Sequence, residues 1–231
     1  MKKRYIILIL IFLLVEFILG YFAQTSIYKD YIRFAIVSLG FGFCFLFIKK
    51  DWIYITTQLA LLFTLIADYF LVILDDYYLI GMLAFLPVQL LYSIRIFLET
   101  NNKKINIIHF CIRIFFNLIA MVLPFIILKE NVDGLSVVSV VYFCNLILNA
   151  IFASINYKKY DFSFIFAIGL ILFVFCDIFV GIMNLSDYFD IEKGSFVYNV
   201  IYSDINFSWV FYTPSQALLA ISLIGYKLNK K

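Results

Sequence analysis

The chain has 231 residues, of which 65% are hydrophobic, 20% aromatic and only 14% charged, with a formal net charge of +3. Soluble globular domains carry about 25% charged residues, so this composition and a mean hydropathy of +1.02 exclude a soluble fold. The composition predicts an all-α, polytopic membrane protein in which residues 1–231 form a single integral membrane domain.

Eight apolar stretches have the length and character of membrane-spanning helices, which need about 20 residues to cross a bilayer. In chain order they cover about 5–23, 31–48, 52–74, 77–98, 105–128, 135–155, 162–185 and 207–226. The first follows a basic start, but its apolar part is longer than the roughly 7–15 residues of a signal peptide, so it is expected to be retained. The sequence therefore predicts an eight-transmembrane-helix bundle in the lipid bilayer.

Basic residues alternate between successive links of this bundle. Twelve fall at the amino terminus, in every second link and in the carboxyl tail, whereas the other links hold four. Because basic loops face the cytoplasm, both termini are predicted to be cytoplasmic, in the cell (cytoplasmic) membrane. The charge forms no basic stripe, so no nucleic-acid partner is expected. The twelve are Lys2, Lys3, Arg4, Lys49, Lys50, Lys103, Lys104, Lys158, Lys159, Lys227, Lys230 and Lys231.

Three acidic residues lie well inside predicted spans: Glu16, Asp68 and Asp177. A carboxylate at the bilayer centre costs roughly 2.5–3.5 kcal/mol, so each needs a partner or a function. Counted from the cytoplasmic side, Asp68 and Asp177 reach similar depths and could meet. Each also lies on a polar or small-residue helix face, which predicts that it faces the bundle interior. The faces consist of Thr57, Leu61, Thr64 and Asp68, and of Gly169, Phe173, Asp177, Gly181 and Asn184.

A short repeat follows each of the two aspartates. FLPVQLLYSI contains Pro87 and Gln89, and YTPSQALLAIS contains Pro214 and Gln216, each on the span after an aspartate. The third and fourth spans and the seventh and eighth thus resemble two parallel copies of one unit, as in many repeat-built membrane proteins. Proline has no backbone N–H, so the carbonyl one turn earlier in the helix loses its hydrogen-bond donor. The glutamines either donate to that carbonyl or line a polar cavity with Tyr92 and Tyr212.

The remaining titratable side chains narrow the possible chemistry. His109 is the single histidine and is expected near the membrane interface, so a histidine-based triad or zinc site is not available. No metal and no cofactor are expected. Arg95 and Arg113 lie within predicted spans, where each either extends toward the interface or binds the phosphate of a lipid headgroup.

Three stretches together are similar to a known family: ADYFLVILDDYYLIGMLAFLPVQLLY, FAIGLILFVFCDIFVGIMNL and WVFYTPSQALLAIS. They resemble the YhhN family of eight-span membrane proteins, which includes the lysoplasmalogenases. The resemblance implies that Asp68 and Asp177 are the catalytic pair. Further positions fit, and three residues depart from the usual glycine, serine and histidine of the family. The fitting positions are Gly81, Phe85, Tyr92, Tyr212 and Gln216, and the departures are Ala67, Cys176 and Gln89.

Lysoplasmalogenases hydrolyse the vinyl ether of a lysophospholipid to a fatty aldehyde and a glycerophospho-alcohol. Protonation of the alkene carbon gives an oxocarbenium ion that water captures, which requires one carboxylic acid and one carboxylate, as in glycosidases. The resemblance implies this hydrolase activity for Asp68 and Asp177. The expected substrate-binding residues are Gln89, Tyr92, Tyr212 and Gln216, with Arg95 or Arg113 at the phosphate.

Other classes of protein also use carboxylates inside the membrane. A proton- or cation-coupled transporter of small molecules would place them along its pathway. An intramembrane aspartyl protease is disfavoured because its GxGD motif is absent, as IAD and FCD indicate. A non-catalytic lipid-binding protein is the third alternative.

Overall fold

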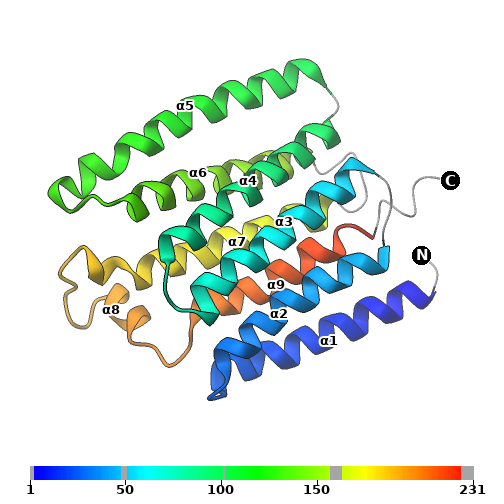
Figure 1. Ribbon diagram of the computed structural model, residues 1–231, viewed down its shortest axis with the longest axis horizontal. Coiled ribbons are helices and arrows are strands. Elements are labelled where there is room, and N and C mark those ends of the chain that lie inside the picture. Colours follow the sequence, from blue (N-terminus) through cyan, green and yellow to red (C-terminus); the bar gives the residue numbers. More distant parts are fainter. Residues whose placement is uncertain (1–2, 48–50, 101, 157–162, 225–231) are drawn as a thin grey trace.

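The computed structural model describes residues 3–47, 51–100, 102–156 and 163–224, and most of these are helical, with no strand among them (Figure 1). Short helical turns extend several of the α-helices, and a π-helical turn, Tyr69–Ile73, continues α3 directly. The all-α fold predicted from composition is therefore confirmed for the described residues. Their α-helices are α1 Lys3–Thr25, α2 Lys29–Cys44, α3 Trp52–Asp68, α4 Tyr78–Thr100, α5 Lys103–Ile127, α6 Gly134–Asn156, α7 Ser163–Met183, α8 Phe196–Ile201 and α9 Phe207–Ile221.

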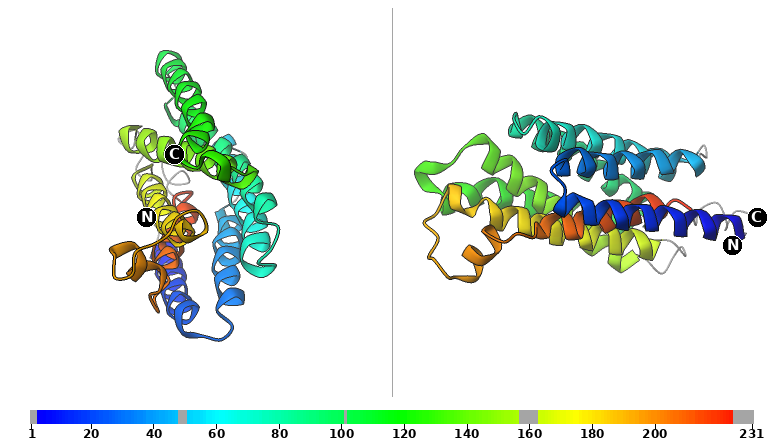
Figure 2. Two further views of the ribbon diagram at one scale, coloured as in Figure 1. Left: turned by 90° about the vertical axis from the view of Figure 1, so that its left-hand side faces the viewer. Right: turned by 90° about the horizontal axis from the view of Figure 1, so that it is seen from below.

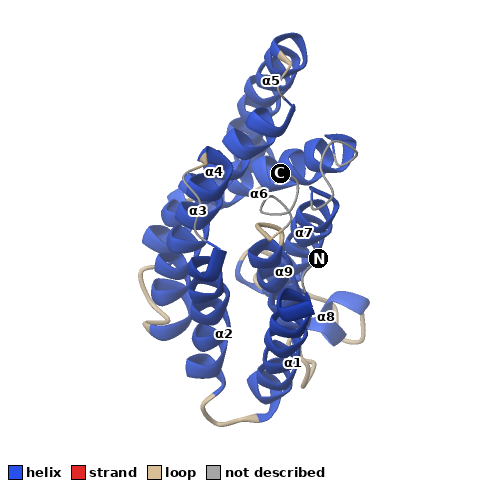
Figure 3. Ribbon diagram, turned by 90° about the vertical axis from the view of Figure 1, so that its right-hand side faces the viewer, coloured by secondary structure: helices blue, strands red, loops and turns tan. Residues whose placement is uncertain are grey.

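The long helices lie side by side as a single bundle (Figures 1 and 2). Helix α3 packs on α4, α4 on α6, α6 on α7 and α7 on α9, while α2 contacts α1, α3 and α9. Helix α5 packs mainly on α6 and projects from one edge, opposite α1 and α2 (Figure 3). The start of α1 and the end of α9 lie at the same end of the bundle (Figure 1).

Six helices of the described chain are long and apolar enough to cross a membrane. Helices α2 and α9 have 16 and 15 residues, short of the roughly 20 that a full crossing needs, so the predicted count of eight is not reached by this measure. The short helix α8 lies in a link where no element was predicted. Eight of the twelve basic residues used to orient the chain lie outside the described residues: Lys2, Lys49, Lys50, Lys158, Lys159, Lys227, Lys230 and Lys231.

Polar side chains fix where several helices begin. Asp51 accepts a hydrogen bond from the backbone N–H of Ile53 at 3.2 Å, and Asn102 accepts one from Lys104 at 3.1 Å. Before α6, the backbone N–H of Ser136 donates to Asp133 at 2.7 Å and lowers the pKa of that carboxyl. Such caps satisfy N–H groups that have no partner inside the helix.

The structure confirms the predicted interior face of α3 and only part of the predicted face of α7. Thr57, Leu61, Thr64 and Asp68 are all buried, as predicted for α3. On α7, Gly169 is in close contact with α9, since an added Cβ would lie 3.0 Å from Leu219. Farther along the same helix, a Cβ added at Gly181 would meet no atom of another described element within 4 Å. The prediction of close helix packing therefore holds for the first half of the α7 face and is wrong at Gly181.

Candidate active site

Asp68 is the last residue of α3, and its side chain is only 3% exposed. The Tyr212 hydroxyl of α9 donates a hydrogen bond to Asp68 Oδ2 at 2.6 Å. The π-helical turn begins at the next residue, a local distortion that recurs at functional sites. Helix α4 approaches this turn at Gly81, where an added Cβ would lie 2.6 Å from Leu71. The Asp68 carboxyl is thus held by a tyrosine from a distant part of the chain, at the start of a turn that packs tightly on α4.

Asp177 lies on α7, close enough to Asp68 for the two charges to interact. Its Oδ2 is shielded from solvent and makes no hydrogen bond with any described residue. The Tyr142 hydroxyl of α6 approaches Asp177 closely enough to interact, although it lacks the geometry of a hydrogen bond. Cys176 is buried and lies near both carboxyls. The two aspartates therefore differ, because one is held by tyrosine and the other keeps a free oxygen.

Aromatic rings pack against the two tyrosines that approach the acids. Phe173 lies 5.4 Å from the Tyr212 ring, Phe85 lies 5.2 Å from the Tyr142 ring, and Trp209 packs edge-on to Tyr212 at 5.0 Å. In surroundings of low dielectric, charges act more strongly than in water. The arrangement suits acid–base chemistry on an apolar substrate.

The glutamines of the repeat are buried, but neither amide nitrogen makes a hydrogen bond with a described residue. The interpretation that they donate to the carbonyls freed by proline is therefore wrong. Gln89 instead accepts a hydrogen bond on Oε1 from Asn149 at 2.9 Å, while Gln216 has no partner for either amide atom. Tyr92 is fully buried, with its hydroxyl near Thr64, one turn before Asp68.

Both acids and both Pro-x-Gln segments lie in one matched region of the chain. The model of the YhhN family matches residues 34–223, which is most of the sequence. This chain belongs to the YhhN family. The predicted resemblance is confirmed, and the match begins after α1, so that Glu16 lies outside it. No curated protein and no solved structure matches the chain.

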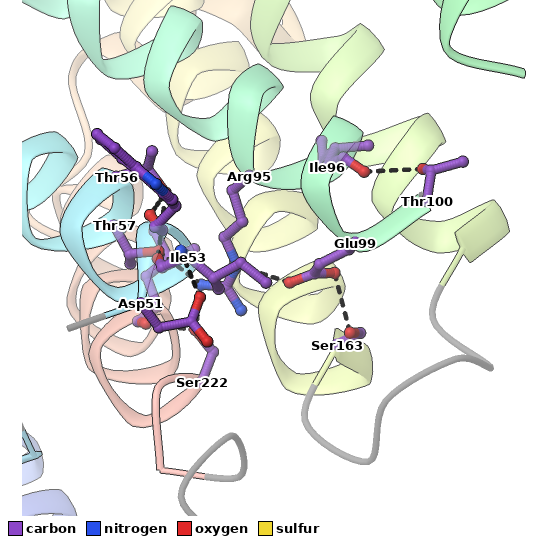
Figure 4. Close-up of polar contacts among 12 residues, drawn as sticks. Asp51, Ile53, Thr56, Thr57, Arg95, Ile96, Glu99, Thr100, Ser163 and Ser222 are labelled. Atoms are coloured by element: carbon purple, nitrogen blue, oxygen red, sulfur yellow. Dashed lines mark hydrogen bonds and ion pairs between the residues drawn. The ribbon is translucent and has the colours of Figure 1, made fainter. Parts of the chain in front are cut away.

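In this YhhN protein Arg95 is completely buried, so the prediction that it extends toward the interface is wrong. Its Nε donates to Glu99 Oε1 at 2.8 Å, and Nη1 donates to the hydroxyls of Thr57 and Ser222 at 3.0 and 2.8 Å (Figure 4). The guanidinium also lies 3.7 Å from the ring centroid of Phe166. Because these protein groups already bind the Arg95 guanidinium, Arg113 is the better candidate for binding a phosphate.

Glu99 is a buried acid that the sequence analysis missed, because it lies near the end of a predicted span. Its second oxygen accepts a hydrogen bond from Ser163 at 2.9 Å, so the Arg95–Glu99 pair connects α3, α4, the start of α7 and the residue after α9 (Figure 4). The signal was present in the sequence, since residues four apart on a helix are neighbours.

Arg113 lies on α5 and is 7% exposed. Its Nη2 donates to Asn149 Oδ1 at 2.7 Å, whereas Nε and Nη1 have no partner among the described residues. His109 is buried and stacked on Phe152 at 3.8 Å. The Arg113 guanidinium faces the same ring at 5.1 Å. A buried cation with two free donor nitrogens is a suitable partner for an anion.

Proposed function

We propose that this YhhN protein is a membrane-embedded hydrolase that cleaves the vinyl ether of a lysoplasmalogen, releasing a fatty aldehyde and a glycerophospho-alcohol. The observation that carries the proposal is the unequal pair of neighbouring acids, a buried Asp68 bonded to Tyr212 and an Asp177 whose shielded Oδ2 has no described partner. Resemblance to a family that includes lysoplasmalogenases supports the same reaction.

In the proposed reaction, Asp177 transfers its proton to the alkene carbon that is not bonded to the ether oxygen, and the vinyl ether becomes an oxocarbenium ion. Asp68 stabilises this cation as a carboxylate and takes a proton from the water that attacks the cationic carbon, giving a hemiacetal. The hemiacetal hydroxyl then returns a proton to Asp177, while Asp68 protonates the departing glycerol oxygen. One water is consumed, and both acids regain their starting states.

Arg113 is the proposed site for the phosphate of the substrate. Tyr142, beside Asp177, and Asn149, bonded to Arg113, both lie on α6. Their separation of seven residues corresponds to about 10 Å along the helix, which is comparable with the length of a glycerophosphate unit. A lysophospholipid could therefore reach Arg113 with its headgroup while its vinyl ether lies between the acids.

Replacing Arg113 with glutamine is expected to raise KM for lysoplasmalogen about tenfold or more, since hydrogen bonds to charged groups contribute about 1.5–3 kcal/mol. Initial rates over a range of substrate concentrations would measure the change. The matched comparison is an alkenylglycerol, which keeps the vinyl ether but has no phosphate. The variant should hydrolyse this compound like the parent protein, and an equal loss on both substrates would contradict the phosphate role.

The hydrolase itself is tested by assaying purified protein in detergent for fatty aldehyde released from lysoplasmalogen. Stoichiometric release of aldehyde and glycerophospho-alcohol is the expected result. Solute flux into liposomes with no aldehyde would favour a proton- or cation-coupled transporter. Binding of the lipid without turnover would favour a lipid-binding protein.

The proposed arrangement in the membrane has eight crossings within one domain. Helices α2 and α9 pack among the six longer helices and would complete the bundle, helped by local thinning of the bilayer and, for α2, by the 3-10 turn Phe45–Phe47 that follows it. The alternation of basic residues supports cytoplasmic termini and insertion in the cell membrane.

A further inference from the structure

Glu16 on α1 is a buried acid with no role in the proposed hydrolysis. Its side chain is 3% exposed, and neither carboxylate oxygen has a hydrogen-bond partner among the described residues. Its neighbours Val15 and Phe17 are 38% and 77% exposed, so only one face of this helix turns inward. A charged carboxylate in such a place requires neutralisation by a partner.

Contacts one helical turn before and one turn after Glu16 show how far along the bundle axis it lies. One turn before it, Phe12 stacks on Phe43 of α2 at 4.1 Å. One turn after it, an added Cβ on Gly20 would lie 3.4 Å from Thr213 of α9. Glu16 therefore lies between α2 and α9, at the level where the chain reaches from Thr213 toward Gln216.

Helix α9 presents further unpaired polar atoms at this level. The Thr213 hydroxyl and both amide atoms of Gln216 have no described partner, although the two residues are 6% and 1% exposed. Gly40 of α2 approaches the Gln216 backbone, where an added Cβ would lie 3.8 Å from the carbonyl oxygen. We call Glu16, Thr213 and Gln216 the Glu16 cluster. Together these three side chains carry four oxygen atoms and a single carboxylate.

The described part of the chain provides no cation for this cluster. The basic residue on the adjacent face is Arg33 of α2, which binds Asp30 at 2.9 Å and lies over the Trp209 ring at 5.2 Å. Arg33 is also seven residues from Gly40, or about 10 Å along the helix. The neutralising charge must therefore come from outside these residues.

We propose that the Glu16 cluster binds a monovalent alkali cation. Carboxylate, hydroxyl and amide oxygens are hard ligands, and one carboxylate balances one positive charge. A divalent cation such as Ca²⁺ takes 6–8 oxygens and usually several carboxylates, which the cluster lacks. Thr213 directly follows Tyr212, the donor to Asp68, so an ion that fixes this turn of α9 would also fix the tyrosine.

Thermal unfolding in detergent with NaCl, KCl or choline chloride at one ionic strength tests the proposal. An alkali salt should raise the Tm of the parent protein above its value in choline by about 3–6 °C at ten times the dissociation constant. Retention of ²²Na⁺ by the purified protein, displaced by unlabelled NaCl or KCl, measures binding directly.

The Glu16→Gln variant needs no counter-charge, so it should be as stable as the parent in choline and should gain nothing from alkali salts. Thr213→Val is a second variant that should weaken ion binding while the carboxylate remains. Glu130→Gln, at an exposed acid, is the control and should respond to alkali salts like the parent. Equal Tm in all three salts for the parent would overturn the proposal, as would a Tm that changes with pH alone, because the neutralising ion would then be a proton.

Discussion

Aldehyde release from lysoplasmalogen is expected to fall by about two to four orders of magnitude when Asp177 is replaced with asparagine, because general acid catalysis contributes about 10²–10⁴-fold. The amide keeps the shape of the side chain but has no carboxylic proton for the alkene carbon. Asp177 Oδ2 has no described hydrogen-bond partner, so the substitution breaks no hydrogen bond at that oxygen. The loss should therefore appear in kcat, with substrate binding and thermal stability near those of the parent protein.

Asp68→Asn should also inactivate the enzyme, since it removes the carboxylate that stabilises the cation. Asp190→Asn changes an exposed acid and serves as the matched control, with unchanged activity expected. Combining both active-site substitutions should cost little more than either alone, because residues that act as a unit are not additive. If either single variant kept more than about a tenth of the parent rate, the two-acid mechanism would be contradicted, given the roughly 10²-fold minimum above.

The sequence was sufficient to predict that the two aspartates face the bundle interior, and the reason is physical. A carboxylate in an apolar helix is costly, and a helical period of 3.6 residues assigns it to one face. Thr57, Leu61 and Thr64 all proved buried on the face of Asp68. Depth along the helix then indicated which acids could meet, and the structure places Asp68 and Asp177 within electrostatic reach.

The surroundings of the acids were less predictable, because they depend on packing between distant helices. Nothing in the local sequence of Tyr142 distinguishes it from the other tyrosines, yet it approaches Asp177. The π-helical turn after Asp68 also has no compositional signal. Likewise, the free donors of Arg113 and the full burial of Arg95 follow from neighbours supplied by other helices.

The two Pro-x-Gln segments of the sequence differ at a position that bears on the acids. Aligning Pro87 with Pro214 makes Phe85 the counterpart of Tyr212. Tyr212 can donate to Asp68, whereas phenylalanine has no hydroxyl to offer the second acid. Tyr142 of α6 lies near Asp177 without a hydrogen bond, and Phe85 packs against the Tyr142 ring at 5.2 Å. The Tyr212 hydroxyl, which Phe85 lacks, is thus the group that holds Asp68.

The Arg95–Glu99 pair leads to the largest expected effect on stability. Replacing Arg95 with methionine should lower the free energy of unfolding by about 3–5 kcal/mol, because it leaves Glu99 buried without its partner. Unfolding of the purified protein by increasing mole fractions of sodium dodecyl sulfate in mixed micelles would measure the loss. Arg33→Met is the matched control, because its partner Asp30 is 47% exposed and stays in contact with solvent when the pair is broken, so a smaller loss is expected.

The double variant Arg95→Met with Glu99→Leu separates the charge of the pair from its place in the packing. Removing both charges abolishes the cost of an unpaired carboxylate, and buried ion pairs replaced by apolar residues are often neutral for stability. The double variant should therefore be more stable than Arg95→Met alone, although Thr57, Ser222 and Ser163 lose hydrogen-bond partners. If the two substitutions simply added their losses, the stabilising element would be the hydrogen-bond network connecting α3 and α7 to the residue after α9, rather than the compensation of charge.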